Sequence, residues 1–177
     1  SVVERVREEI KRVLENSKRA VDKVREDIKR VLDESRKAIK EVEDEIRKVL
    51  EEVERGGIDE ELRKELKRIV DELRAELKKL LDENEEAVKE LEERLKKLTR
   101  DNEEIVERLE RRLKKTTDSD TVRRIVEEIE KVSRESVKRL EDIVREMKKI
   151  SEESKETVDR IVEKIREVVK RLLEAAK

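Results

Sequence analysis

The sequence predicts an all-α protein: a straight, nearly untwisted, antiparallel, up-down-up bundle of three long helices. Three observations lead to this fold class. Apolar residues recur along the chain with a period of 18 residues. Helix-forming residues dominate the composition, and the chain has no proline. The pattern breaks only twice, once at the two glycines and once at a cluster of threonine, serine and aspartate, so three helices are expected in a single domain over residues 1–177.

The composition lies far from that of an ordinary soluble domain. Charged residues make up 56% of the 177 residues, and aromatic residues, histidine and cysteine are absent. Ordinary domains are about 25% charged. Such a composition fits either a disordered chain or long amphipathic helices, and the periodic apolar pattern favours helices. The 49 basic and 51 acidic residues are evenly mixed, so no segment offers the one-signed surface that binds nucleic acid or an anionic membrane.

The first helix is expected over residues 2–55. Its repeat units place apolar residues in register, for example Val3, Val21 and Ile39. A unit of this length makes about five turns of an unstrained helix and keeps the apolar stripe on one face, whereas a heptad repeat would impose a left-handed supercoil. The helix should end at the only two glycines of the chain, where a left-handed residue closes the last turn without strain.

The second helix is expected over residues 60–115 and the third over about 120–177. Asp59 is the expected N-cap of the second helix, and Ser119 or Asp118 that of the third. Adjacent pairs of apolar residues widen the stripe of the second helix, as expected for a helix that contacts two neighbours. Connections this short make consecutive helices antiparallel. Each helix would be about 80 Å long.

Polar residues interrupt the apolar stripes at related positions of all three helices. If consecutive helices are antiparallel, these residues meet in two layers, and a third level is wholly apolar. The first layer comprises Ser17, Asn102, Ser133 and Ser136; the second comprises Ser35, Asn84, Ser151 and Ser154; the apolar level comprises Val53, Leu66, Val169 and Leu172. Asn16 and Thr99 lie close enough in sequence to join the first layer.

The expected role of these layers is to fix the register of the helices. An asparagine left unpaired in a core costs about 1–3 kcal/mol, so each layer is expected to close a hydrogen-bond network with its serines. A helix displaced by one whole repeat, about 27 Å, would set polar residues against apolar ones. In the alternative interpretation, the serines lie at the edge of the stripe in contact with water.

The regular repeats, minimal loops, interleaved charges and Asn/Ser layers inside a Val/Ile/Leu core resemble those of de novo designed, parametrically generated helical bundles with buried hydrogen-bond networks. The resemblance covers the whole chain. Natural spectrin-type repeats resemble it less, because they have aromatic core anchors. The resemblance implies high stability, a role as a scaffold, building block or switch component, no natural substrate, and recombinant expression in a cytoplasm.

The residues do not favour catalysis, and no catalytic, cofactor-binding or metal-binding residue is expected. Without histidine or cysteine, proton transfer would fall to carboxylates or lysines with shifted pKa values, which need burial. The acidic residues instead lie on polar helix faces beside lysine or arginine. We find neither a targeting pattern nor an apolar run long enough to span a membrane. The expectation is therefore no enzyme, and no nucleic-acid or membrane partner.

The favoured function is a rigid structural scaffold that requires no partner. One alternative is a helix-exchange binding module or switch, in which a free helix competes for the place of the third helix. A second alternative is a self-assembling building block, in which Val2, Ala20, Ala38 and Leu81 at the edges of the stripes contact another copy. Dense surface charge opposes a large apolar patch, so a monomer is favoured.

The oligomeric state gives a first prediction. Light scattering should give a molar mass near 21.2 kDa, that of one chain, because three stripes close one core. The protein concentration must be measured by refractive index, since the chain has no tryptophan or tyrosine. A mass two or three times larger would instead favour the assembly interpretation.

Overall fold

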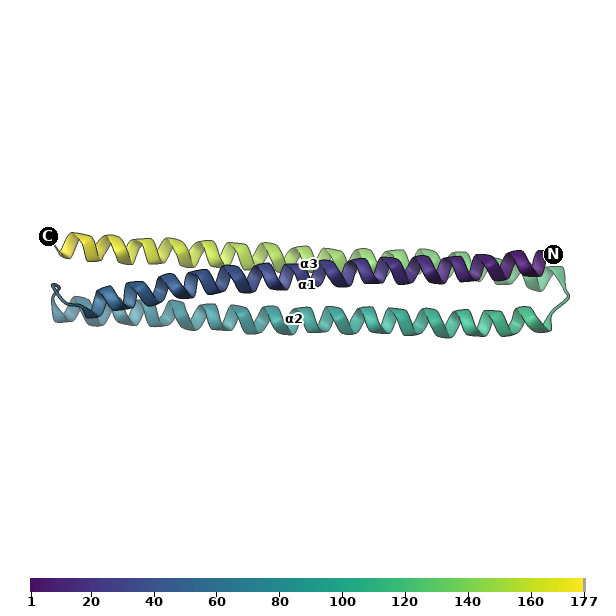
Figure 1. The fold of residues 1–177 in the computed structure, drawn as a ribbon, viewed down its shortest axis with the longest axis horizontal. Coiled ribbons are helices and arrows are strands. Elements are labelled where there is room, and N and C mark those ends of the chain that lie inside the picture. Colours follow the sequence, from purple (N-terminus) through teal and green to yellow (C-terminus); the bar gives the residue numbers. More distant parts are fainter. Residues whose placement is uncertain (177) are drawn as a thin grey trace. The chain divides into compact units, whose positions relative to one another are not determined.

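A computed structural model describes residues 1–176, and its three α-helices confirm the predicted all-α bundle. In chain order they are α1, Val2–Glu54; α2, Glu60–Lys115; and α3, Ser119–Ala175 (Figure 1). Helices make up 94% of the chain, and no strand occurs in the described range. Each helix packs against both of the others. The predicted bounds of the first two helices and the predicted start of the third are right to within about one residue, which is a usual disagreement at frayed helix ends. Residue 177, where the third helix was expected to end, lies outside the described residues.

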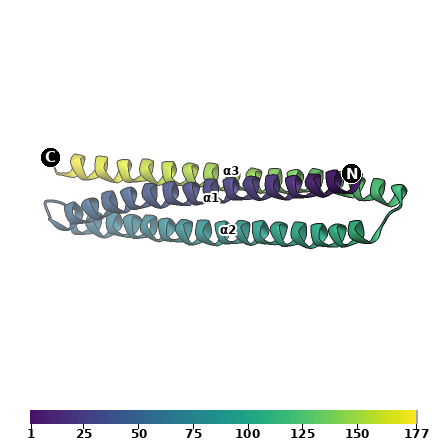
Figure 2. The same cartoon turned by 45° about the vertical axis from the view of Figure 1, so that its right-hand side comes forward.

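Contacts within the bundle gather into two compact units. Unit 1 comprises residues 1–29 and 89–147, and unit 2 comprises residues 30–88 and 148–177. Each unit therefore contains a part of all three helices. In unit 1 the start of α1 lies beside the end at which α2 passes into α3, and in unit 2 the end of α3 lies beside the α1–α2 connection (Figures 1 and 2). The single domain expected from the length stays a prediction.

The core of unit 2 is a continuous apolar cluster that draws on all three helices. The leucines come mainly from α2, and the β-branched residues come mainly from α1 and α3. The buried members are Ile39, Val42, Ile46, Val49 and Val53 from α1; Leu66, Val70, Leu73, Leu77 and Leu80 from α2; and Ile161, Ile165, Val168 and Leu172 from α3. Burial of each such side chain contributes about 1.5–3 kcal/mol before the entropy of ordering the chain is counted.

An apolar cluster of unit 1 is built in the same way near the chain's N-terminus. Its buried members are Val6 and Ile10 from α1; Val106, Leu109 and Leu113 from α2; and Val122, Ile125 and Ile129 from α3. On each helix the buried residues are mostly three or four positions apart, which is the spacing of one helix face. The 18-residue period of the sequence therefore describes the buried stripe.

The α1–α2 connection depends on two left-handed glycines. Gly56 has φ 96° and Gly57 has φ 82°, and no other residue in the described chain has positive φ. A left-handed backbone ends α1 and turns the chain toward α2, as the glycine pair predicts. Asp59 then caps α2, because its Oδ1 accepts a hydrogen bond from the backbone N–H of Glu61 at 3.4 Å.

The N-cap of α3 is Asp118, one of the two residues that the sequence offered. Asp118 Oδ1 accepts the backbone N–H of Asp120 at 3.2 Å, and Oδ2 accepts the hydroxyl of Thr121 at 3.1 Å. Its own backbone N–H donates to Thr116 Oγ1 at 3.2 Å. Ser119 is consequently the first helical residue. The two carboxylate oxygens of Asp118 accept these two hydrogen bonds at separate positions, which favours Asp118 as the cap.

The glycine turn gives a prediction about stability. Replacing Gly57 by alanine should lower the free energy of unfolding by about 1 kcal/mol, because an L-residue pays for the left-handed conformation. No atom lies within 4 Å of the added Cβ, so the loss would come from the backbone alone. Gly57→Asn should lose less, since asparagine tolerates this conformation. Guanidinium unfolding followed by circular dichroism measures both, and an unchanged midpoint for Gly57→Ala would contradict the assignment.

Candidate functional site

Four polar side chains are buried within the apolar stripes of the described chain. Asn84 is 6% exposed, and Asn102, Ser136 and Ser154 are each 5% exposed. A buried amide or hydroxyl without a partner costs about 1–3 kcal/mol in proteins. Each of the four makes hydrogen bonds to a neighbouring helix. They form two separate layers, one inside each unit.

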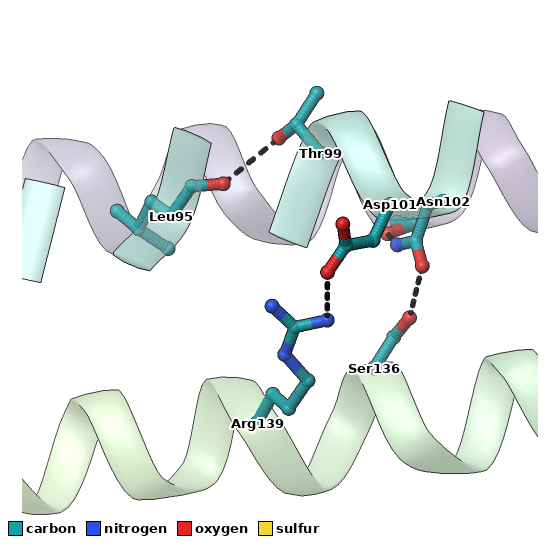
Figure 3. A network of polar contacts seen from close by, with 7 residues as sticks. Leu95, Thr99, Asp101, Asn102, Ser136 and Arg139 are labelled. Atoms are coloured by element: carbon teal, nitrogen blue, oxygen red, sulfur yellow. Dashed lines mark hydrogen bonds and ion pairs between the residues drawn. The ribbon is translucent and has the colours of Figure 1, made fainter. Parts of the chain in front are cut away.

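The layer of unit 1 is a chain of two hydrogen bonds centred on α2. Asn102 donates from Nδ2 to Ser17 Oγ on α1 at 2.8 Å, and its Oδ1 accepts the Ser136 hydroxyl of α3 at 3.1 Å. Figure 3 shows the Ser136 side chain pointing at Asn102 across the α2–α3 interface. The amide thus uses its donor toward one neighbouring helix and its acceptor toward the other, and holds all three helices at one level.

The layer of unit 2 is a closed triangle. Asn84 donates from Nδ2 to Ser35 Oγ on α1 at 2.7 Å and to Ser154 Oγ on α3 at 3.0 Å. The two serine hydroxyls lie 3.1 Å apart and share a third hydrogen bond. From the first layer to the second, the serine on α1 lies one repeat later in the chain and the asparagine on α2 lies one repeat earlier. An antiparallel pair of helices requires this relation.

The number of hydrogens available to the triangle determines whether Nδ2 or Oδ1 of Asn84 points into it. Three contacts need three hydrogens: two come from Nδ2, and one comes from a serine hydroxyl. An amide turned by about 180° would require both hydroxyls to donate to Oδ1, which leaves no hydrogen for the contact between Ser35 and Ser154. The triangle therefore has Nδ2 inside. Asn84 Oδ1 and one hydroxyl hydrogen remain outside it.

Two of the predicted layer residues do not join these networks. Ser133 and Ser151 are half-buried on α3, and the hydrogen bonds of the layers run through Ser136 and Ser154 instead. Each lies three residues before its bonded counterpart, which rotates its side chain by about 60° away from the same α2 residue. The asparagine amide is too short to reach both. Ser133 and Ser151 therefore fit the alternative interpretation, in which serines lie at the edge of the apolar stripe.

The two residues near the first layer also lie outside it. Asn16 is exposed. Thr99 is half-buried, and its hydroxyl donates to the backbone carbonyl of Leu95 at 3.1 Å, one turn back on the same helix (Figure 3). This bond within α2 satisfies the hydroxyl locally. Proximity in sequence was therefore a poor guide to membership in the layer.

The apolar level lies in unit 2, where the sequence places it. Val53 and Leu66 are fully buried, Leu172 is 8% exposed, and Val169 packs against the same cluster. Asn84 faces Ser35, one repeat away from this level. Sliding α1 along α2 by one repeat would set Asn84 against Val53 in one direction, or Ser35 against Leu66 in the other. Each slip leaves a polar group without its partner.

Ion pairs between helices flank the layers, and their residues were not among those predicted from the sequence to form the layers. Arg139 Nη1 on α3 lies 3.0 Å from Asp101 Oδ2 on α2, next to the Asn102–Ser136 bond (Figure 3). In unit 2, Arg36 Nη2 lies 3.2 Å from Glu85 Oε1, next to Ser35 and Asn84. In the sequence, Asp101, Arg36 and Glu85 each adjoin a layer residue, and Arg139 follows the layer residue Ser136 by three positions. Such exposed pairs contribute about 0–1 kcal/mol each, so they support the register weakly.

The chemistry of the layers is that of neutral hydrogen bonds. The layer serines contact asparagine or serine, and none of their hydrogen bonds reaches a carboxylate or an amine that could activate a hydroxyl. Elsewhere in unit 2, a hydrogen bond from Arg171 to Glu65, 3.2 Å long, holds the pKa of the Glu65 carboxyl below its ordinary value. A lowered pKa makes Glu65 a weaker base, whereas a general base needs a pKa near neutral pH.

Residues 1–176 contain no group of three or more acidic, histidine or cysteine side chains placed to hold a metal ion. Within the same range, none of the helices combines the length and the apolar character needed to cross a membrane. No family model matches the chain, and neither a curated protein nor a solved structure matches it.

The two layers should respond differently to the same substitution. In Asn84→Leu, Ser35 and Ser154 keep their mutual hydrogen bond. In Asn102→Leu, both hydrogen bonds of the layer disappear, and Ser17 and Ser136 lose their shared partner. We expect Asn102→Leu to be less stable than Asn84→Leu by about 1 kcal/mol.

Guanidinium unfolding of the two variants, side by side, measures this difference. The variants are matched controls for each other, because the same side chain is replaced at repeat-related positions of one helix. Equal midpoints would mean that the serine–serine bond of unit 2 contributes nothing once the amide is gone.

Proposed function

We propose that the chain is a designed, catalytically inert structural scaffold in which the two polar layers fix the register of three helices. The observation that supports this most directly is the bonding of Asn84 and Asn102, each of which contacts a serine on both neighbouring helices. The regular repeats and the even mixture of acidic and basic residues support a designed origin. A designed scaffold needs neither a substrate nor a cofactor, and requires no partner.

Register is the property that a repeated sequence most needs to secure. Apolar stripes built from one unit match equally well after a shift of one repeat, so burial alone favours several registers. The polar layers reduce this ambiguity, because both asparagines face serines in one register. After a shift of one repeat, Asn84 would face Val53 or Ser35 would face Leu66. Polar residues that restrict alternative pairings in helical bundles act in the same way.

Helix exchange is the competing function, and one titration separates it from a scaffold. An isotope-labelled α3 peptide, residues 119–175, is incubated with the intact protein, and its incorporation is followed by size-exclusion chromatography. We expect no incorporation, because releasing α3 would expose the cores of both units and open both layers.

A control establishes that the peptide is competent. When peptide and protein are unfolded together in guanidinium and refolded, labelled peptide should enter the bundle. Incorporation without the denaturation step would contradict the scaffold and support a binding module that exchanges its third helix.

A further inference from the structure

A partly enclosed cavity of about 170 Å³ lies in unit 2, directly beside the Asn84 triangle. It is formed between α1 and α3, and Asn84 with its neighbour Val88 closes it from α2. Its apolar wall comprises Val31, Leu32, Ala38, Val88, Ile150 and Val158. Asn84, Ser35 and Ser154, together with Ser151, supply its neutral polar lining. The cavity therefore combines an apolar body with one neutral hydrogen-bonding end.

Two apolar residues that line the cavity, Val158 and Ile150, differ in size from the related residues of unit 1, Leu140 and Val132. One repeat before Val158, the related position of unit 1 is Leu140, whose side chain is buried and only 8% exposed. Val158 is one methylene shorter and half-buried. A shorter side chain in a packed interior leaves space unless the neighbours move in. The difference is readable in the sequence, but its consequence depends on the packing around the triangle.

The hydrogen count of the triangle defines what the polar end offers. Both hydrogen bonds of Asn84 leave from Nδ2, so Oδ1 takes no part in the triangle. Only one of the two serine hydrogens is used between Ser35 and Ser154. The triangle therefore leaves one acceptor and one hydroxyl hydrogen uncommitted on three side chains that line the cavity. A hydroxyl group complements both, since it donates one hydrogen bond and accepts another.

We propose that this cavity is a binding site for a small neutral alcohol with a single apolar ring, of which phenol is the simplest probe. Its ring lies against the apolar wall, and its hydroxyl donates to Asn84 Oδ1 and accepts from a serine hydroxyl. The size agrees with this class of ligand, because an engineered cavity of about 150 Å³ in another protein accommodates benzene.

Neither water nor a charged ligand fits the site as well. Water can make the same two hydrogen bonds, but it leaves the apolar wall with few dispersion contacts, and a ring provides them. An ionised ligand would lose its hydration against that wall. The charged residues that line the cavity, Glu34, Lys155 and Asp159, are exposed and of mixed sign, so they do not compensate a buried charge.

The chain is well suited to a direct test by NMR. It has no aromatic residue and no histidine, so in heavy water the aromatic proton region contains only ligand signals. Saturating the methyl protons of the intact protein should reduce the phenol signals in a concentration-dependent way. Toluene, which has a methyl group in place of the hydroxyl, should bind about tenfold more weakly because it leaves the polar end unpaired.

Two matched variants locate the site. Val158→Leu introduces the residue found at the related position of unit 1, so the bundle should remain folded while the cavity closes and the phenol signal is lost. Val162→Leu makes the same change one turn further along α3, at a residue that does not line the cavity, and should bind phenol as the parent does. Circular dichroism verifies that both variants are folded.

Several results would overturn the proposal. They are the absence of saturation transfer from the parent protein, transfer that persists in Val158→Leu, and equal loss in both variants. If toluene bound as tightly as phenol, Asn84 would not act as the hydrogen-bond acceptor for the ligand, and alcohols would not be the ligand class.

Discussion

The hydrogen-bonding demand of two buried asparagines constrains the rest of this structure. An amide that has left water must find partners, and within the core only serines from other helices provide them. Asn84 reaches Ser35 and Ser154, while Asn102 reaches Ser17 and Ser136. Because these partners come from α1 and α3, satisfying one amide fixes the levels of three helices together. The short connections set the direction of the helices, and this requirement sets their alignment within each unit.

The apolar clusters have a different part in the energetics. They supply most of the favourable free energy of folding, since the hydrophobic free energy is proportional to the apolar area removed from water. That term depends little on register in a repeated sequence, because Val, Ile and Leu recur at equivalent places. The polar layers contribute less free energy, but their contribution changes sharply when the register changes. Stability and specificity therefore reside in different residues of the same stripes.

The two layers also show that identical residues need not make identical bonds. Asn102 uses both its donor and its acceptor in an open chain, whereas Asn84 uses only its nitrogen in a closed triangle. Their surroundings also differ, because Val158 lines a cavity in unit 2 at the position where unit 1 has the buried Leu140. The triangle leaves Asn84 Oδ1 outside its three hydrogen bonds. Equal repeats can thus carry polar layers that are bonded differently.

The sequence by itself determined the three helices, the glycine turn after α1 and the Asp59 cap of α2, because these depend on local periodicity and backbone preference. It also paired Ser17 with Asn102 and Ser35 with Asn84, since antiparallel helices with equal repeats leave few alternatives. Only the tertiary structure decided that Ser136 and Ser154 bond to the amides while Ser133 and Ser151 do not. It also decided how each amide is turned. Those outcomes depend on differences of about 60° in side-chain direction around the helix axis and on the packing of neighbouring side chains. A repeat pattern does not encode these details.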